Sequence, residues 1–126
     1  MNYRQTRDYL LSRPEAVEDF PFGPDVAVFK IRGRVFALLM ERQGIARINL
    51  KCDPVEAQFL RDMFEAVRPG YHMNKTHWNT VDLDESVPHG ELQRMIDRSY
   101  GLVVRGLKKA QRLALEQLYG NGEIYR

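Results

Sequence analysis

The sequence lacks the features that place a protein in a specialised class. It holds one cysteine, Cys52, so no disulfide can form within the chain, and a reducing cytoplasm is the simplest compartment. No stretch approaches the roughly 20 apolar residues of a membrane-spanning helix, and the first residues have no apolar centre typical of a signal peptide. We therefore expect a cytoplasmic protein without a membrane anchor.

An excess of one charge sign is also missing. Nineteen Lys and Arg against 17 Asp and Glu leave a net charge of +2, which does not by itself indicate a nucleic-acid-binding protein. There is no Gly-rich phosphate loop, internal repeat or low-complexity tract. The 126 residues, 44% of them hydrophobic, fit one globular domain. We predict a single domain over residues 1–119 and a frayed tail over 120–126.

Hydrophobic patterns in the first half predict a helix followed by a strand meander. The helix is expected over residues 3–12, and the connection after it is expected to pack Phe20 and Phe22 against the core. Three strands are predicted, over residues 26–31, 34–40 and 45–51. The pair Arg32-Gly33 between the first two is typical of a tight hairpin.

Alternation in the third strand predicts an antiparallel sheet with one solvated face. Its apolar residues Ala46, Ile48 and Leu50 alternate with the polar residues Arg47, Asn49 and Lys51. In the central strand, Phe36 shares a face with Arg34, so the open face is expected to mix aromatic and basic groups.

A capping signal, Asp53-Pro54-Val55-Glu56, predicts the start of a second helix. Apolar residues at helical spacing continue it towards Arg68; these are Phe59, Leu60, Met63, Phe64 and Val67. Short strands are then expected over residues 71–73 and 77–83, and a last long helix from Pro88, with a break possible at Gly101 or Gly106.

The stretch PGYHMNKTHWNTV, residues 69–81, follows neither a helical nor a strand period. Polar and aromatic residues interleave in it as they do on loops that carry binding residues. With VFKIRGRVFALL, INLKCDP and DRSYGLVV, this stretch resembles the MmcQ/YjbR family, over about residues 8–107. The resemblance implies a fold like that of CyaY and frataxin, in which helices cover one face of an antiparallel sheet in a two-layer sandwich, and it implies DNA binding.

A basic and aromatic sheet face is the candidate site. Lys and Arg neutralise phosphates, and aromatic rings stack on exposed bases. The candidate nucleic-acid-binding residues are Lys30, Arg34, Arg47, Lys51, Tyr71, Lys75, His77 and Trp78. Two alternatives remain: the cations simply keep the sheet soluble, and Trp78 anchors the core, which tryptophan's usual burial favours.

Catalytic and metal sites are not expected. Cys52 precedes the capped helix, where amides can lower a thiol's pKa, but neither His72 nor His77 is placed beside it by any pattern. The histidine spacing does not suit a metal site. We therefore expect no enzyme and no cofactor. A DNA ligand is the first hypothesis, a protein partner the second and frataxin-like metal handling the third, with a monomer favoured.

Overall fold

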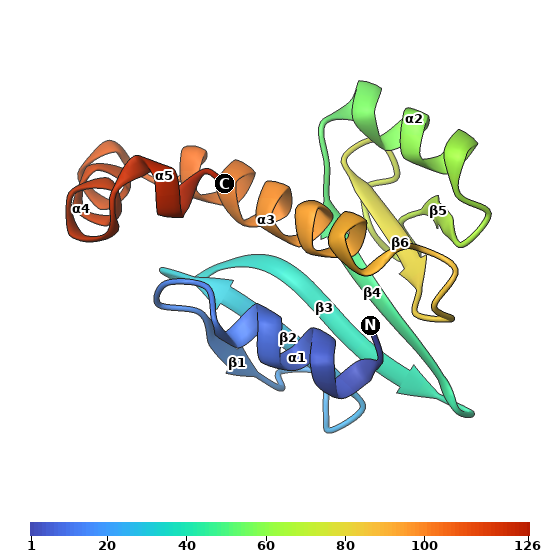
Figure 1. The fold of residues 1–126 in the computed structure, drawn as a ribbon. Helices are drawn as coiled ribbons and strands as arrows, with labels where there is room; N and C mark the ends of the chain where they lie inside the picture. The colour runs from blue at the N-terminus through green and yellow to red at the C-terminus, as the bar shows by residue number, and fades with distance from the viewer.

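The computed structural model describes residues 1–126 and contains a six-stranded antiparallel sheet with helices packed on it (Figure 1). In chain order, the elements are α1 (Tyr3–Leu11), β1 (Val17–Asp19), β2 (Val26–Ile31), β3 (Arg34–Arg42), β4 (Ile45–Lys51), α2 (Pro54–Met63), β5 (Val67–Pro69), β6 (Trp78–Asp82), α3 (His89–Arg105), α4 (Lys109–Tyr119) and α5 (Asn121–Ile124). The strands are ordered β1-β2-β3-β4-β6-β5. This confirms the predicted α+β class.

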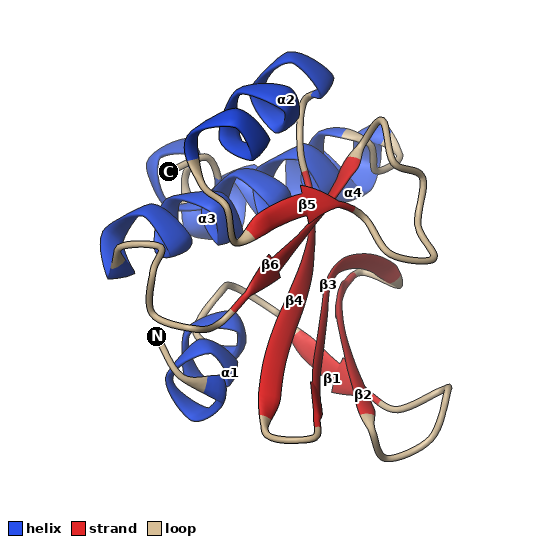
Figure 2. Ribbon diagram, turned by 90° about the vertical axis from the view of Figure 1, so that its right-hand side faces the viewer, coloured by secondary structure: helices blue, strands red, loops and turns tan.

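The helices α1, α2 and α3 lie on one side of the sheet, which we call the core face, and the opposite side is the open face (Figure 2). Alternate strand residues such as Phe29, Ile48 and Val81 point into the core, where they are almost completely buried. As expected, β4 sends Ile48 and Leu50 into the core, and alternation places the buried Ala46 on the same face. Paired residues of an antiparallel ladder share a face, so the ladder also places Arg47, Asn49 and Lys51 on the open face.

One tight turn and one helix cap follow the sequence signals. Arg32 and Gly33 have φ angles of 49° and 83°, so both central residues of the β2–β3 hairpin take the left-handed conformation of a type I′ turn. The predicted cap also forms, because the Asp53 carboxylate accepts hydrogen bonds from the amides of Val55 and Glu56 at 3.1 and 3.2 Å.

A β-bulge changes the face on which Phe36 lies. The register between β2 and β3 shifts after Phe29, so that Ala37 pairs with Phe29 while Val35 pairs with Lys30. Phe36 is therefore turned into the core, where its ring meets the Tyr100 ring edge-on at 5.3 Å. The expectation that Phe36 shares the open face was wrong, since strict alternation cannot anticipate an extra residue.

Helix α3 is fastened to the sheet by a serine. The Ser99 hydroxyl donates to the Phe36 carbonyl oxygen at 2.6 Å and accepts the Lys51 amide at 2.8 Å. One buried side chain thus joins β3, β4 and α3. Ser99 belongs to the DRSYGLVV motif, so these structural hydrogen bonds account for the serine of that motif without any role in binding.

Several element boundaries differ from those expected. The second helix ends at Met63, and Val67–Pro69 forms the edge strand β5 instead of a helix end. Residues 71–73 form turns, not a strand. Val17–Asp19 forms a further edge strand, β1, and the nearby rings of Phe20 and Phe22 are exposed, not packed. Short edge strands carry too few residues for a clear alternation.

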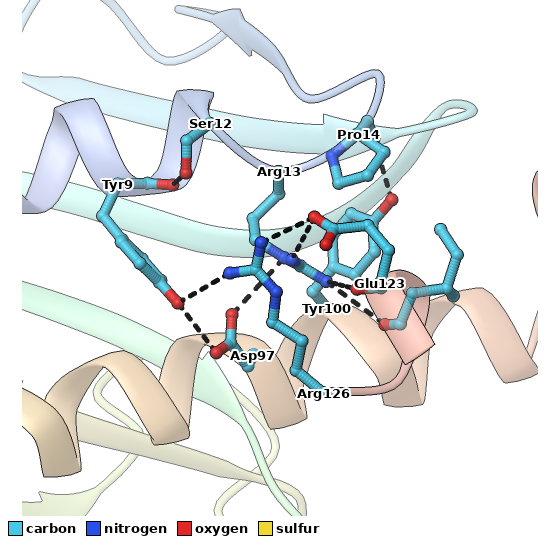
Figure 3. Close-up of polar contacts among 9 residues, drawn as sticks. Tyr9, Ser12, Arg13, Pro14, Asp97, Tyr100, Glu123 and Arg126 are labelled. Atoms are coloured by element: carbon cyan, nitrogen blue, oxygen red, sulfur yellow. Dashed lines mark hydrogen bonds and ion pairs between the residues drawn. The ribbon is translucent and has the colours of Figure 1, made fainter. Parts of the chain in front are cut away.

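The last helix breaks at Gly106, and a separate helix, α4, begins at Lys109 with Lys108 at its N-cap. The tail predicted to be frayed contains α5, and Ile124 is fully buried. The carbonyl oxygens of Glu123 and Ile124 in this tail accept hydrogen bonds from the buried side chain of Arg13, which follows α1 (Figure 3). The tail had no apolar period long enough to predict this contact.

Candidate functional site

The loop between β5 and β6, residues 70–77, is built on close backbone packing. A Cβ atom added at Gly70 would lie 2.8 Å from the Trp78 Cβ and 3.0 Å from the Trp78 carbonyl oxygen. The Asn74 side chain accepts the Thr76 amide at 2.9 Å, which forms a tight turn. The loop therefore has a defined shape despite its exposure.

Arg61 of α2 holds this loop from the helix side. Its Nε donates to the Asn79 side-chain oxygen at 2.7 Å, and its Nη2 donates to the carbonyl oxygens of Lys75 and Trp78. Asn79 in turn donates to the Ala57 carbonyl oxygen at 3.4 Å. One guanidinium thus connects α2, β6 and the loop.

Trp78 lies on the open face, where it pairs directly with Lys51 of β4. Its side chain is half-buried and is not part of the core cluster. The expectation that Trp78 anchors the core was therefore wrong, because the helices cover the other face. Lys51 forms no ion pair and is only half-buried.

The loop brings Tyr71 and Lys75 to the same end of the sheet. The Tyr71 amide donates to the Thr80 hydroxyl at 2.9 Å, and that hydroxyl donates to the Asn49 side chain at 2.6 Å on the open face. The Lys75 ammonium donates to the Gly70 carbonyl oxygen at 3.2 Å and has no acidic partner. We call Lys51, Tyr71, Lys75 and Trp78 the Trp78 surface.

Exposed rings extend the Trp78 surface. The Tyr71 side chain is 63% exposed, and its ring lies 4.0 Å from the His72 ring, centroid to centroid. His72 has a φ of 58°, in the left-handed region that non-glycine residues seldom adopt. This histidine was missing from the predicted site.

Further along the open face, two arginines share one acid. Asp82 Oδ1 lies 3.1 Å from Arg47 Nε and 2.6 Å from Arg68 Nη2. Arg47 is therefore largely neutralised, but the trio keeps one net positive charge. Arg68 was also missing from the predicted site, since its placement on β5 was not anticipated.

The remaining predicted site residues lie apart. Lys30 is paired with Asp19 of β1 at 3.0 Å. Arg34 pairs with Ile31, so it lies on the helix side at the end of the hairpin. His77 is exposed, but it precedes Trp78 and alternation directs it to the opposite side of β6. The structure thus gathers four of the eight predicted residues.

Cys52 is buried, and burial is the main cause that raises the pKa of its thiol, to about 11; Glu56 and Asp53 add to this effect. The sequence had suggested the opposite direction, from helix amides. No three His, Cys, Asp or Glu side chains gather as metal ligands. None of the helices combines the length and hydrophobicity that crossing a bilayer demands.

A separate hollow of about 290 Å³ lies between α3 and the C-terminal residues. Its charged side chains are Asp53, Glu56, Asp97, Arg98, Arg105 and Arg126. Acids and arginines are equal in number there, so charge favours no ligand class. None of the four residues of the Trp78 surface lines this hollow.

Comparisons with known proteins show which family this chain resembles. The YjbR family model matches residues 11–102. The uncharacterized protein YjbR of Escherichia coli K12 is 31% identical over 118 residues, covering 94% of this chain and all of that protein. The uncharacterized protein YbdF of Escherichia coli O157:H7 is 43% identical over 90 residues, or 71% of this chain and 74% of that protein.

A solved structure agrees with the fold. The crystal structure of Deinococcus radiodurans protein DR2400, a DUF419 domain, matches with a TM-score of 0.82 and 36% identity, covering 89% of this chain and 86% of that one. A Pseudomonas syringae protein matches with a TM-score of 0.72 and 32% identity, covering 81% of this chain and 98% of its own. The sequence matches and the shared fold agree, and the chain belongs to the YjbR family.

Proposed function

We propose that this protein is a binding module that contacts single-stranded nucleic acid through the Trp78 surface. The observation that carries the proposal is the meeting of two lysines without acidic partners, Lys51 and Lys75, with the rings of Tyr71 and Trp78. Ammonium groups neutralise phosphates, and aromatic rings supply stacking that tolerates any base.

Single strands fit this surface better than a duplex. The exposed Tyr71 ring and the His72 ring beside it offer stacking faces, which only unpaired bases can use fully. The surface also has only two unpaired lysines, together with the net charge of the Arg47, Arg68 and Asp82 trio. That is a modest electrostatic contribution, so stacking has to supply much of the affinity.

A role in binding, not catalysis, is part of the proposal. The one thiol is buried, and its raised pKa of about 11 leaves it protonated at neutral pH. The four residues of the Trp78 surface include no serine, threonine or cysteine. The rigid loop supports binding, because a surface already held in shape loses little freedom when a ligand is bound.

The test is fluorescence anisotropy of a labelled oligothymidine strand and of a duplex, over a series of salt concentrations. We expect tighter binding of the single strand. The Lys51→Gln, Lys75→Gln double variant should reduce the slope of log affinity against log salt by about 1.4, from about 0.7 per phosphate contact. Tyr71→Ala should weaken binding by about five-fold or more through lost stacking.

The matched control is Lys30→Gln, Arg34→Gln, which removes the same charge from outside the Trp78 surface. We expect this control to keep most of the wild-type affinity and slope. No binding even at low salt, or an equal loss in the control, would contradict the proposal.

A further inference from the structure

Helix α2 exposes a stripe of large apolar side chains to solvent. Val55, Phe59 and Met63 are 80%, 59% and 53% exposed. They are four residues apart, so they lie along one side of the helix. The opposite side, with Ala57 and Leu60, is buried in the core.

The stripe is not required by the fold. Val55, Phe59 and Met63 lie on the side of α2 that faces away from the sheet, and all three stay exposed because nothing in the chain covers that side (Figure 2). Contiguous exposed apolar side chains on a soluble domain commonly mark an interaction site. The stripe spans about 12 Å along the helix, at 1.5 Å per residue, which matches two turns of a partner helix.

The charged side chains of α2 and its flanks that form no ion pair and stay exposed are acidic. Asp53, Asp62 and Glu65 are exposed, and none of them forms an ion pair. The one basic residue of the helix, Arg61, is turned to the loop and to Asn79. Glu56 is already paired with Arg94 at 3.0 Å. A partner therefore meets an apolar stripe with acids beside it and at its ends.

We propose that α2 docks an amphipathic helix of another protein, whose apolar face is flanked by Lys or Arg. Apolar anchors at helical spacing are the usual way in which two helices recognise each other in such complexes. Basic flanks on the partner complement the acids of α2 and exclude partners with acidic flanks.

A second copy of this chain fits the stripe less well. In an antiparallel pair of α2 helices, Asp53 of one copy approaches the Asp62 and Glu65 end of the other. In a parallel pair, each acid approaches its own equivalent. Like charges meet in both arrangements, which disfavours self-association. The docking proposal uses none of the Trp78 surface residues, so it stands or fails independently of nucleic-acid binding.

The test titrates the full chain with a designed amphipathic helical peptide of leucine and lysine, and with its twin in which glutamate replaces every lysine. We expect calorimetry to detect binding of the lysine peptide only. Phe59→Ser and, separately, Met63→Ser should weaken it by about ten-fold or more, because apolar anchors carry most of the binding energy at such interfaces.

Leu118→Ser is the matched control, since Leu118 is another exposed apolar residue, 66% exposed, on α4. It should bind the lysine peptide as the wild type does. Asp62→Lys should weaken binding and flatten its salt dependence. No binding of the lysine peptide, equal binding of both peptides, or unchanged binding by the Phe59 and Met63 variants would overturn the proposal. Sedimentation of a wild-type dimer that Phe59→Ser dissociates would also overturn it, in favour of a second copy.

Discussion

The buried guanidinium of Arg13 donates a hydrogen bond to the main-chain carbonyl oxygen of Glu123 at 2.8 Å, and so joins the end of α1 to the end of the chain (Figure 3). The same side chain lies 3.4 Å from Asp97 and over the ring of Tyr100 at 4.4 Å. The family model ends at residue 102, so the residues that Arg13 meets at the C-terminus lie beyond it. This contact makes the C-terminal segment part of the core.

Replacing Arg13 should therefore be costly. One oxygen of the Asp97 carboxylate is buried and accepts no hydrogen bond. Arg13→Met also removes the positive charge that lies beside this oxygen. Breaking a buried ion pair from one side costs about 3–5 kcal/mol in the free energy of unfolding. Urea denaturation measures this loss. Arg7→Met, which breaks the more exposed pair with Glu18, should cost at most about 1 kcal/mol. Similar losses in both variants would show that Arg13 has no special role.

Gly70→Ala should destabilise the loop and the sheet edge. The new methyl group meets the Trp78 Cβ at 2.8 Å and its carbonyl oxygen at 3.0 Å, and neither backbone-attached atom can move freely. Overpacking of this kind costs about 1–3 kcal/mol. Thermal unfolding and a changed Trp78 fluorescence spectrum report it. In Gly90→Ala the methyl group meets no atom within 4 Å, so stability should stay equal or rise.

Arg61→Met should loosen the loop without unfolding the protein. The change removes the donors to the Asn79 side chain and to the carbonyl oxygens of Lys75 and Trp78. Hydrogen exchange of the amides of residues 70–77 should become faster, and stability should fall by about 1–3 kcal/mol. Arg68→Met is the control, because its exposed pair with Asp82 does not touch the loop. Unchanged exchange rates would show that the loop holds its shape unaided.

Cys52 should react slowly in the folded protein. Its thiol pKa is raised from 9.0 to about 11, chiefly by burial. At pH near 8 the thiolate fraction is then roughly a hundred-fold smaller than in the unfolded chain, and alkylation should slow at least in proportion. Mass spectrometry of iodoacetamide labelling, with and without urea, measures the ratio. Equal rates in the two conditions would contradict the burial of this thiol.

The same shift makes stability depend on alkaline pH. Between about pH 9 and 11 the unfolded chain releases the thiol proton while the folded chain keeps it. The unfolded state then binds fewer protons, so the stability of the folded state falls as the pH rises through this window. Cys52→Ala should lose this component of the pH dependence, and a comparison of the two unfolding curves isolates it from other groups that titrate there.

The local signals were enough to predict much of the scaffold. Arg32-Gly33 indicated the hairpin, Asp53-Pro54 the start of α2, and the alternation through Ile48 the faces of β4. Each depends on neighbours in the sequence, whose conformational preferences act without the rest of the fold. The family resemblance was confirmed on the same stretches.

The site could be predicted only in part. The sequence indicated that residues 69–81 form a contact surface, and Trp78 does lie beside Lys51. It did not indicate that Arg47 is neutralised by Asp82, 35 residues away, or that Arg61 holds the loop from α2. Partners this distant in sequence leave no periodic signal.

The sequence by itself determined the main helices, the β2–β4 meander with its hairpin turn and the alternation of faces in β4, because these follow from backbone preferences and residue spacing. The tertiary structure decided which faces are covered. It exposed Phe59 and Met63 on α2, turned Phe36 inward through a bulge and buried Arg13 under the C-terminus. Whether an apolar or charged side chain is buried depends on what packs above it, and that neighbour is supplied by a distant part of the chain.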